Sequence, residues 1–212
     1  MRQQLHFRLP GTWHRIDLRG GDRSEASIAS VVRDTIGGSD DRARQRAELR
    51  RDLRGALEAA RRAEATSMMF ATEIAHRTPM PLTLVVHAPT RLRMSPSIGT
   101  APEQVLAVLA ESLGRHAPER AASLVRRTGA GAPALRTHRS ERIEPVAETG
   151  DARRLAADYW LPVPGTKQVV LVRLTTPLGE IADLVLSLCD VLVEAAYFAP
   201  TAAPGLAEEL RR

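Results

Sequence analysis

The stretch that decides the fold is RRLAADYWLPVPGTKQVVLVRLT, residues 153–175. Apolar, β-branched and aromatic side chains dominate its two ends, residues 153–161 and 168–175, which is the composition of strands. Between them, residues 162–167 read P-V-P-G-T-K, a turn-forming loop of a length that suits a hairpin. The sequence therefore predicts two neighbouring antiparallel strands here.

Further strand-like runs extend this hairpin into a sheet. Two of them precede it directly, at residues 121–127 and 133–143, and a third covers residues 82–87. Alternating apolar residues between 5 and 18 add one or two short strands. Because short turns join consecutive strands, we expect an α+β fold with an antiparallel sheet of about five to seven strands, packed against helices.

Helical spacing appears in three segments before the hairpin. A short helix is expected near residues 24–36, and another begins near Pro102. Between them, Ser39 can cap a long helix predicted over residues 40–76. Its apolar or small positions keep helical spacing along one side, and the opposite side is rich in arginine. We expect this helix to lie on the surface with its arginines in water.

The last predicted helix spans residues 178–198. Its polar residues form one narrow line, and every other side is apolar: Asp183, Ser187, Asp190 and Glu194. A helix with so narrow a polar line must be covered on several sides, so we expect Leu188 and Leu192 to be fully buried. The acidic line is either a solvated stripe or a contact with arginines of a second subunit, which would make the protein a homodimer.

Length and composition predict a single α+β domain over residues 1–198, followed by a flexible tail at 199–212. Cys189 is the only cysteine, so no disulfide can form within the chain. Residues 1–11 lack the apolar core of a signal peptide, and acidic residues interrupt the apolar run at 181–199. We therefore expect a cytoplasmic protein without a membrane span.

The basic character of the chain comes almost entirely from arginine. The formal net charge is +5, and Lys167 is the only lysine. This usage, with abundant alanine and no asparagine, is typical of a GC-rich genome and gives little support for nucleic-acid binding. Single-strand binding also needs several exposed aromatic residues, and aromatics make up only 3% of the chain. Binding of nucleic acid through an arginine-rich surface is the third functional hypothesis.

No sequence motif predicts catalysis, a metal ion or a cofactor. The six histidines are scattered, without HExxH or His-x-His spacing, and neither a GxSxG nor a P-loop pattern occurs. Cys189 lies among leucines, where a thiol behaves as a small apolar group and not as a nucleophile. We expect no catalytic, metal or cofactor site, and an enzyme of unrecognised type is the second hypothesis.

Two features are candidates for binding a partner. Neighbouring strands carry Arg126, Arg136, His138 and Arg139, which would form a basic patch for acidic partners if they gather on one surface. Charges that protect a sheet edge explain them equally well. Trp160 is out of phase with the apolar residues of its strand, so it is either an exposed contact beside the P-V-P-G loop or a residue packed under a helix.

Three segments resemble an uncharacterised actinobacterial protein group: F-x-L-P-x-x-W-x-x-I-x-L at residues 7–18, Y-x-L-P-x-P-G at 159–165 and T-T-P at 175–177. Members of this group resemble the PsbP-type α+β fold and are often encoded near type VII secretion genes. Non-enzymatic binding proteins use that fold, among them a secretion chaperone family. The resemblance therefore implies a binding or adaptor role with a protein partner, which is the leading hypothesis. The predicted helix at 40–76 departs from the small versions of that fold.

Overall fold

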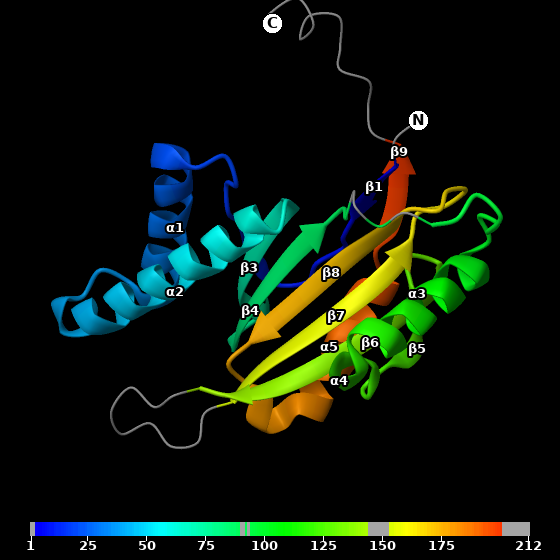
Figure 1. The fold of residues 1–212 in the computed structure, drawn as a ribbon. Coiled ribbons are helices and arrows are strands. Elements are labelled where there is room, and N and C mark those ends of the chain that lie inside the picture. Colours follow the sequence, from blue (N-terminus) through cyan, green and yellow to red (C-terminus); the bar gives the residue numbers. More distant parts are fainter. Residues whose placement is uncertain (1–2, 90–91, 93, 144–152, 201–212) are drawn as a thin grey trace, which may run out of the picture.

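A seven-stranded antiparallel sheet forms the centre of the computed structural model, which describes residues 3–89, 92, 94–143 and 153–200 (Figure 1). The strand order is β2-β3-β4-β8-β7-β6-β5. The bounds are β2 Thr12–Arg15, β3 Ala65–Ala75, β4 Thr78–His87, β5 Val125–Gly129, β6 Ala132–Arg142, β7 Arg153–Pro162 and β8 Val169–Thr176. A separate two-stranded sheet pairs β1, Gln3–His6, with β9, Tyr197–Pro200. The predicted α+β class and antiparallel sheet are confirmed.

The hairpin of β7 and β8 lies in the middle of the sheet. Its register runs from the Leu155–Thr176 pair to the Pro162–Val169 pair, and the predicted loop joins the two strands. Every residue of β7 from Leu155 to Pro162 is buried. A strand buried on both faces needs a cover on each side, and this requirement places the helices.

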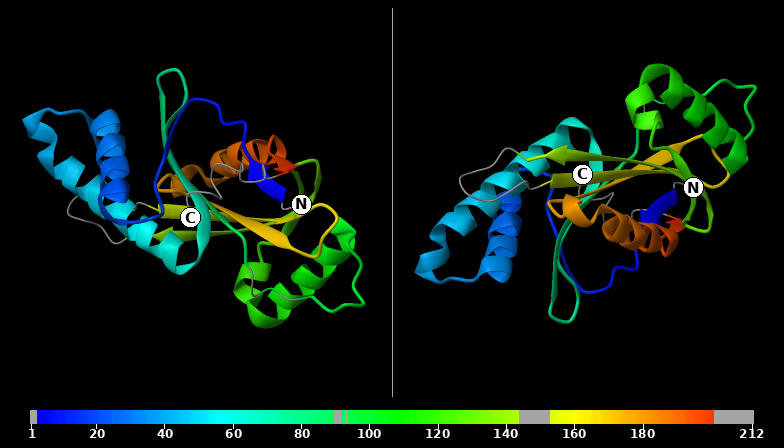
Figure 2. Two further views of the ribbon diagram at one scale, coloured as in Figure 1. Left: turned by 90° about the horizontal axis from the view of Figure 1, so that it is seen from above. Right: turned by 90° about the horizontal axis from the view of Figure 1, so that it is seen from below.

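Of the five α-helices in the described ranges, four pack on one face of the sheet and one on the other. Figures 1 and 2 show this arrangement. α1, Gly21–Ile36, and α2, Ala43–Arg62, pack over β3 and β4, while α3, Pro102–His116, and the short α4, Pro118–Ala121, pack over β6 and β7. α5, Ala182–Glu194, covers the opposite face. Among the described helices, α5 is the sole cover of that face.

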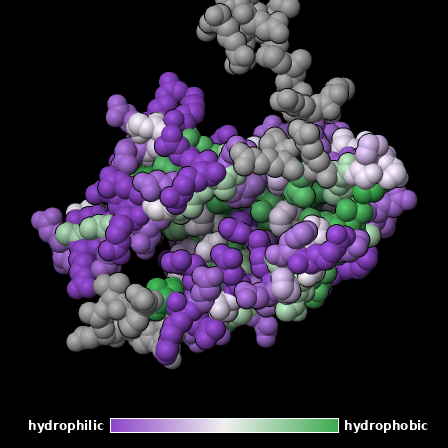
Figure 3. All heavy atoms as spheres, in the orientation of Figure 1, coloured by the Kyte–Doolittle hydropathy of each residue, from purple (hydrophilic) through white to green (hydrophobic). Residues whose placement is uncertain are grey.

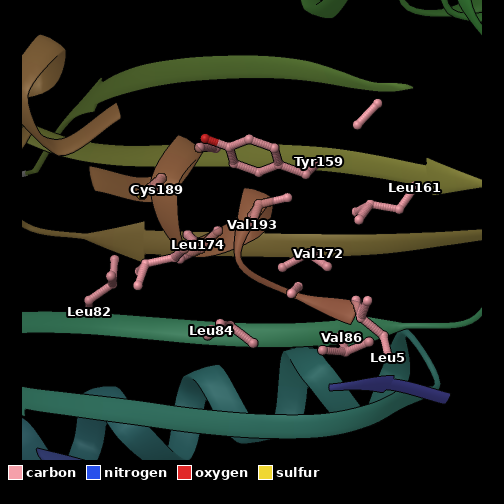
Figure 4. Close-up of a cluster of buried hydrophobic side chains, with 14 of the residues drawn as sticks. Leu5, Leu82, Leu84, Val86, Tyr159, Leu161, Val172, Leu174, Cys189 and Val193 are labelled. Atoms are coloured by element: carbon pink, nitrogen blue, oxygen red, sulfur yellow. The ribbon is translucent and has the colours of Figure 1, made fainter. Parts of the chain in front are cut away.

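Strand alternation divides the apolar side chains between the two faces. In β4, Leu82, Leu84 and Val86 point into the core under α5, whereas Val85 packs under α1 and α2. Figure 4 shows the first three beside Val172 and Leu174 of β8, with Cys189 and Val193 of α5 above them. On the opposite face, hydrophilic side chains dominate the outer surface (Figure 3).

The helix predicted over residues 40–76 is confirmed to Arg62 and is wrong beyond it. A 3-10 turn at Asp40–Arg42 leads into α2, and Glu64 then takes a positive φ of 53° that turns the chain. The following residues form β3, paired with β2 and β4. No glycine or proline separates the helix from the strand, so the apolar spacing continued without a break. Residues 65–75 form a strand because they hydrogen-bond to β2 on one side and to β4 on the other.

The last helix is shorter than predicted. A 3-10 turn at Gly179–Ile181 precedes α5, which ends at Glu194, and the chain then extends into β9. Ala199 and Pro200, placed in the predicted tail, pair with Gln4 and Gln3 of β1. Residues 201–212 lie outside the described part of the chain, so a flexible tail there remains a prediction.

No helix in the described ranges is both long enough and apolar enough to cross a membrane.

Replacing Leu57 by alanine tests the two faces of α2. Leu57 is buried with Ile28 and Phe70, so Leu57→Ala should lower the free energy of unfolding by about 2–5 kcal/mol. Arg51 is exposed beside Asp52, and Arg51→Ala should change it by less than about 0.5 kcal/mol. Urea unfolding of both variants measures the difference. Equal losses would show that the faces are assigned wrongly.

Candidate functional site

The predicted basic residues do not gather on one surface. Arg136 and His138 of β6 point toward α5, on the side of the sheet where Ala134 joins the α5 core. Arg139 points to the opposite side, and so does Arg126 of β5, which pairs with Leu135 under α3. The structure therefore divides the four residues between two faces, and a single patch built from all of them does not exist.

Trp160 lies under a helix and not at the surface. Only 7% of the residue is exposed, and it packs with Val105, Leu106 and Leu109 of α3. Of the two alternatives for Trp160, the exposed partner contact is wrong and packing under a helix is confirmed. The reason is that α3 covers this face of β7, which the strand pattern alone does not show.

Arg136 takes part in a polar cluster beneath α5. Its Nη1 donates to Oδ2 of Asp190 at 2.7 Å, and Arg127 Nε donates to the same oxygen at 2.8 Å. The hydroxyl of Tyr159 donates to Oδ1 of Asp190 at 2.6 Å, and burial raises the pKa of Tyr159 above its usual range. Asp190 therefore meets arginines of its own chain, which corrects the expectation of a solvated residue or one paired with a second subunit.

A second polar cluster lies on the other face of β7. Arg173 donates two hydrogen bonds to Asp158, Nε to Oδ1 at 2.6 Å and Nη2 to Oδ2 at 2.8 Å, and Arg120 also contacts Asp158 Oδ2. Burial alone would raise the pKa of Asp158, but the hydrogen bonds and charges of the two arginines outweigh it and hold that pKa below its usual value. The carboxylate of Asp158 is therefore paired with arginines of its own chain.

Burial shifts the pKa of two side chains of types that often take part in catalysis. Cys189 is buried, and burial raises the pKa of its thiol to about 12. His138 is half-buried, and burial together with the charge of Arg136 lowers its pKa. In the described residues, His, Cys, Asp and Glu side chains form no group that could hold a metal ion.

A surface hollow of about 650 Å³ lies beside the start of α1. Three arginines line it, but Arg19 is paired with Asp17, whose Oδ2 lies 2.5 Å from Arg19 Nη2. Arg15 and Arg23 are exposed, and no buried polar group fixes the position of a ligand there. The hollow offers positive charge without a built binding site.

The outer side of α5 and of the 3-10 turn that leads into it carries an exposed apolar stripe, which we define as Ile181, Leu184, Leu188 and Val191. Leu184 is 67% exposed, Val191 61% and Ile181 46%, while Leu188 is half-buried at the edge of the core. The other large apolar residue exposed in the described chain is Tyr197, whose ring stacks on His6 with centroids 5.4 Å apart. Among the described residues, the exposed large apolar side chains are thus concentrated on α5 and the turn that precedes it.

The exposure of this stripe was not predicted from the sequence, because the last helix was expected to be covered on several sides. The structure covers it on one side only. Leu192 is fully buried as predicted, but the prediction for Leu188 is wrong, since it lies where the core-facing side meets solvent. The available signal was the spacing of residues 181, 184, 188 and 191, which places them along one line of a helix.

Acidic residues flank the stripe on one side. We call Glu180, Asp183 and Glu194 the acid row; with Asp190 they lie along one line of the helix, on the side that faces β5 and β6. None of the three forms an ion pair within the described chain. No lysine, arginine or histidine occurs between Pro177 and Pro200. The outer surface of α5 is therefore apolar and acidic in a protein of net charge +5.

Comparison with protein-family models and with curated proteins gives no match. Among solved structures, the chain is similar to LpqN of Mycobacterium tuberculosis, a protein involved in cell envelope biogenesis. The TM-score is 0.41 and the identity 11%, over 94% of this chain and 85% of LpqN. A likeness this distant carries no functional inference, so we base the proposal on the side chains of this protein.

Asp158 should make the stability of the protein depend on acid. The pKa of Asp158 is lower in the folded protein than the usual aspartate value of about 3.9, which applies to the unfolded chain. Asp158 therefore stabilises the fold fully at pH values above the unfolded pKa, and this stabilisation is lost as the pH falls through the pKa of the folded state. Asp158→Asn should cost about 2–3 kcal/mol at neutral pH and weaken the loss of stability in acid. Chemical unfolding across acid pH tests this. Glu25→Gln, which breaks a surface pair with Arg54, is the matched control, and an equal effect of both would contradict the prediction.

Two leucines of α5 should respond differently to a charge. Leu192 is 1% exposed, so Leu192→Asp should prevent folding, because an unpaired buried carboxylate costs several kcal/mol. Leu184→Asp should change the free energy of unfolding by about 1 kcal/mol or less, since this side chain points into water. Circular dichroism melts compare the two. A folded Leu192→Asp variant would overturn the assignment of the buried side.

Proposed function

We propose that this protein is a non-enzymatic binding protein that docks a protein partner on the apolar stripe of α5. The observation that carries the proposal is the concentration of exposed large apolar side chains on this one helix. Single exposed apolar residues are normal in soluble proteins, whereas a contiguous set on one element marks an interaction surface. A partner surface of matching shape would remove this set from water.

The energetics favour such docking. Fully burying one leucine, isoleucine or valine side chain contributes about 1.5–3 kcal/mol, and three of the four stripe residues are substantially exposed in the isolated chain. The core does not need Ile181, Leu184 or Val191, since Val185, Cys189, Leu192 and Val193 already fill the inner side of α5 and Leu188 packs at its edge. The stripe is therefore free to serve a partner without loss of the fold.

The state of the polar groups also supports binding and not catalysis. Asp158 and Asp190 each accept hydrogen bonds from two arginines, and the thiol of Cys189 is buried. An active site instead needs groups that are free to exchange protons or attack a substrate. We extend the proposal to an adaptor or chaperone-like role in the cytoplasm, linked to type VII secretion, on the resemblance of residues 7–18 and 159–165 to actinobacterial proteins encoded beside such genes.

Affinity capture with matched variants tests the proposal. Wild type, the double variant Leu184→Glu/Val191→Glu and the control Ala59→Glu, at an exposed position of α2, are immobilised and exposed to an extract of the source organism. We expect wild type and the control to retain the same discrete protein in near-equal molar amount, and the double variant to retain about tenfold less. Melting temperatures confirm that all three are folded. Equal retention by the double variant would overturn the proposal.

A further inference from the structure

We infer that the partner presents an amphipathic α-helix with lysines or arginines along one edge, and that this helix lies lengthwise on α5. The inference rests on the proposed function and names the chemistry of the surface that the stripe receives. Three points support this inference: the helical spacing of the apolar residues, the position of the acid row on one side of the stripe, and the poor fit of a second copy of the chain or a membrane surface.

The spacing of the stripe suits a helix. Its residues follow one another at intervals of three, four and three, which is the a and d spacing of a helical seam. From Ile181 to Val191 the stripe is about 15 Å long, enough for almost three turns of a second helix. An extended peptide would instead need the free backbone of an edge strand, and the backbone of α5 is already hydrogen-bonded within the helix.

The acid row determines the charge of the partner's edge. Asp190 contacts Arg127 of β5 and Arg136 of β6, so the acid row lies on that side of α5 and the stripe lies beyond it. A helix seated on the stripe places one of its edges over Glu180, Asp183 and Glu194. Because none of these carboxylates forms an ion pair with an arginine or lysine among the described residues, basic residues on that edge complement them.

The other side of the stripe is apolar rather than charged. On the same face of the sheet, Phe7, Leu9, Trp13, Met69 and Ile74 are only partly buried against the core that α5 covers. Figure 2 shows the β3–β4 hairpin projecting on this side as well. A partner helix therefore meets charge along one edge and apolar surface along the other, which fixes its direction of approach.

Two other occupants fit this surface poorly. In an antiparallel pair of α5 helices from two copies, two-fold symmetry brings the acid row beside its own copy, and like charges repel. A helix that lies on a membrane surface has basic residues beside its apolar side, which contact anionic lipid, whereas α5 has only acids there.

Fluorescence anisotropy with two synthetic helices tests the inference. Both peptides, of about 18 residues, carry leucine at the a and d positions, with lysines along the flanks of one and glutamates along the flanks of the other. We expect wild type to bind the lysine peptide about tenfold or more tightly than the glutamate peptide, and more weakly as salt is raised from about 50 to about 500 mM.

Three variants separate the contributions. Leu184→Glu/Val191→Glu should lose the lysine peptide, and Ala59→Glu should bind it like wild type. The acid-row variant Glu180→Gln/Asp183→Asn/Glu194→Gln keeps the stripe and should bind the two peptides with affinities within about threefold of each other. Equal binding of both peptides by wild type, or binding that the acid-row variant leaves unchanged, would overturn the inference.

The outcomes also distinguish this inference from the proposed function. If neither peptide binds while capture from the extract still depends on Leu184 and Val191, the partner is a protein but not a basic helix. If wild type doubles its mass in sedimentation and Leu184→Glu/Val191→Glu does not, a second copy occupies the stripe and the inference fails. Binding of wild type to anionic phosphatidylserine vesicles in preference to the lysine peptide would assign the stripe to lipid and overturn both.

Discussion

The rest of the structure depends on the burial of β7 and β8 on both faces of the sheet. A strand in this position exposes apolar side chains alternately to either side, so one layer of helices is not sufficient. α3 and α4 satisfy one side by packing over Trp160 and Leu135, and α5 satisfies the other by packing over Tyr159 and Leu161. The two faces carry different numbers of helices. On its own face, α5 has no neighbouring helix in the described chain.

The same arrangement explains why polar clusters lie under the helices. Arginines of the strands lie beside the helices, and each face of β7 supplies one polar group to their clusters. On the α3 side this group is Asp158, which accepts hydrogen bonds from Arg173. On the α5 side it is the hydroxyl of Tyr159, which donates to Asp190. Removing one partner would leave a buried charge uncompensated, so both clusters fix the position of the helices as well as satisfying the strands. Of the residues expected to meet a partner, Arg136 therefore belongs to the fold.

Much of the sheet could be predicted from the sequence because alternation and turn residues are local signals. The same alternation, applied to positions 136, 138 and 139, already places Arg139 on the opposite face from the other two. The sequence alone therefore argued against predicting a single basic patch. The end of α2 was harder to locate, because residues 65–75 keep helical spacing and become a strand only through pairing with β2 and β4. The exposure of the stripe was not predictable, since a sequence shows which sides of a helix are apolar but not how many of them the fold will cover.

In the proposed complex, the stripe and the acid row of α5 would have different roles. Apolar contact supplies affinity but little orientation, because leucine accepts many neighbours; charges at the rim supply little affinity but exclude partners of the wrong sign. With acids on one edge only, a helix that docks in the reverse direction, or rolled about its axis, loses its charge complement while keeping its apolar contact. The placement of the acid row beside the stripe, and not around it, would therefore give the proposed partner helix a single direction on α5.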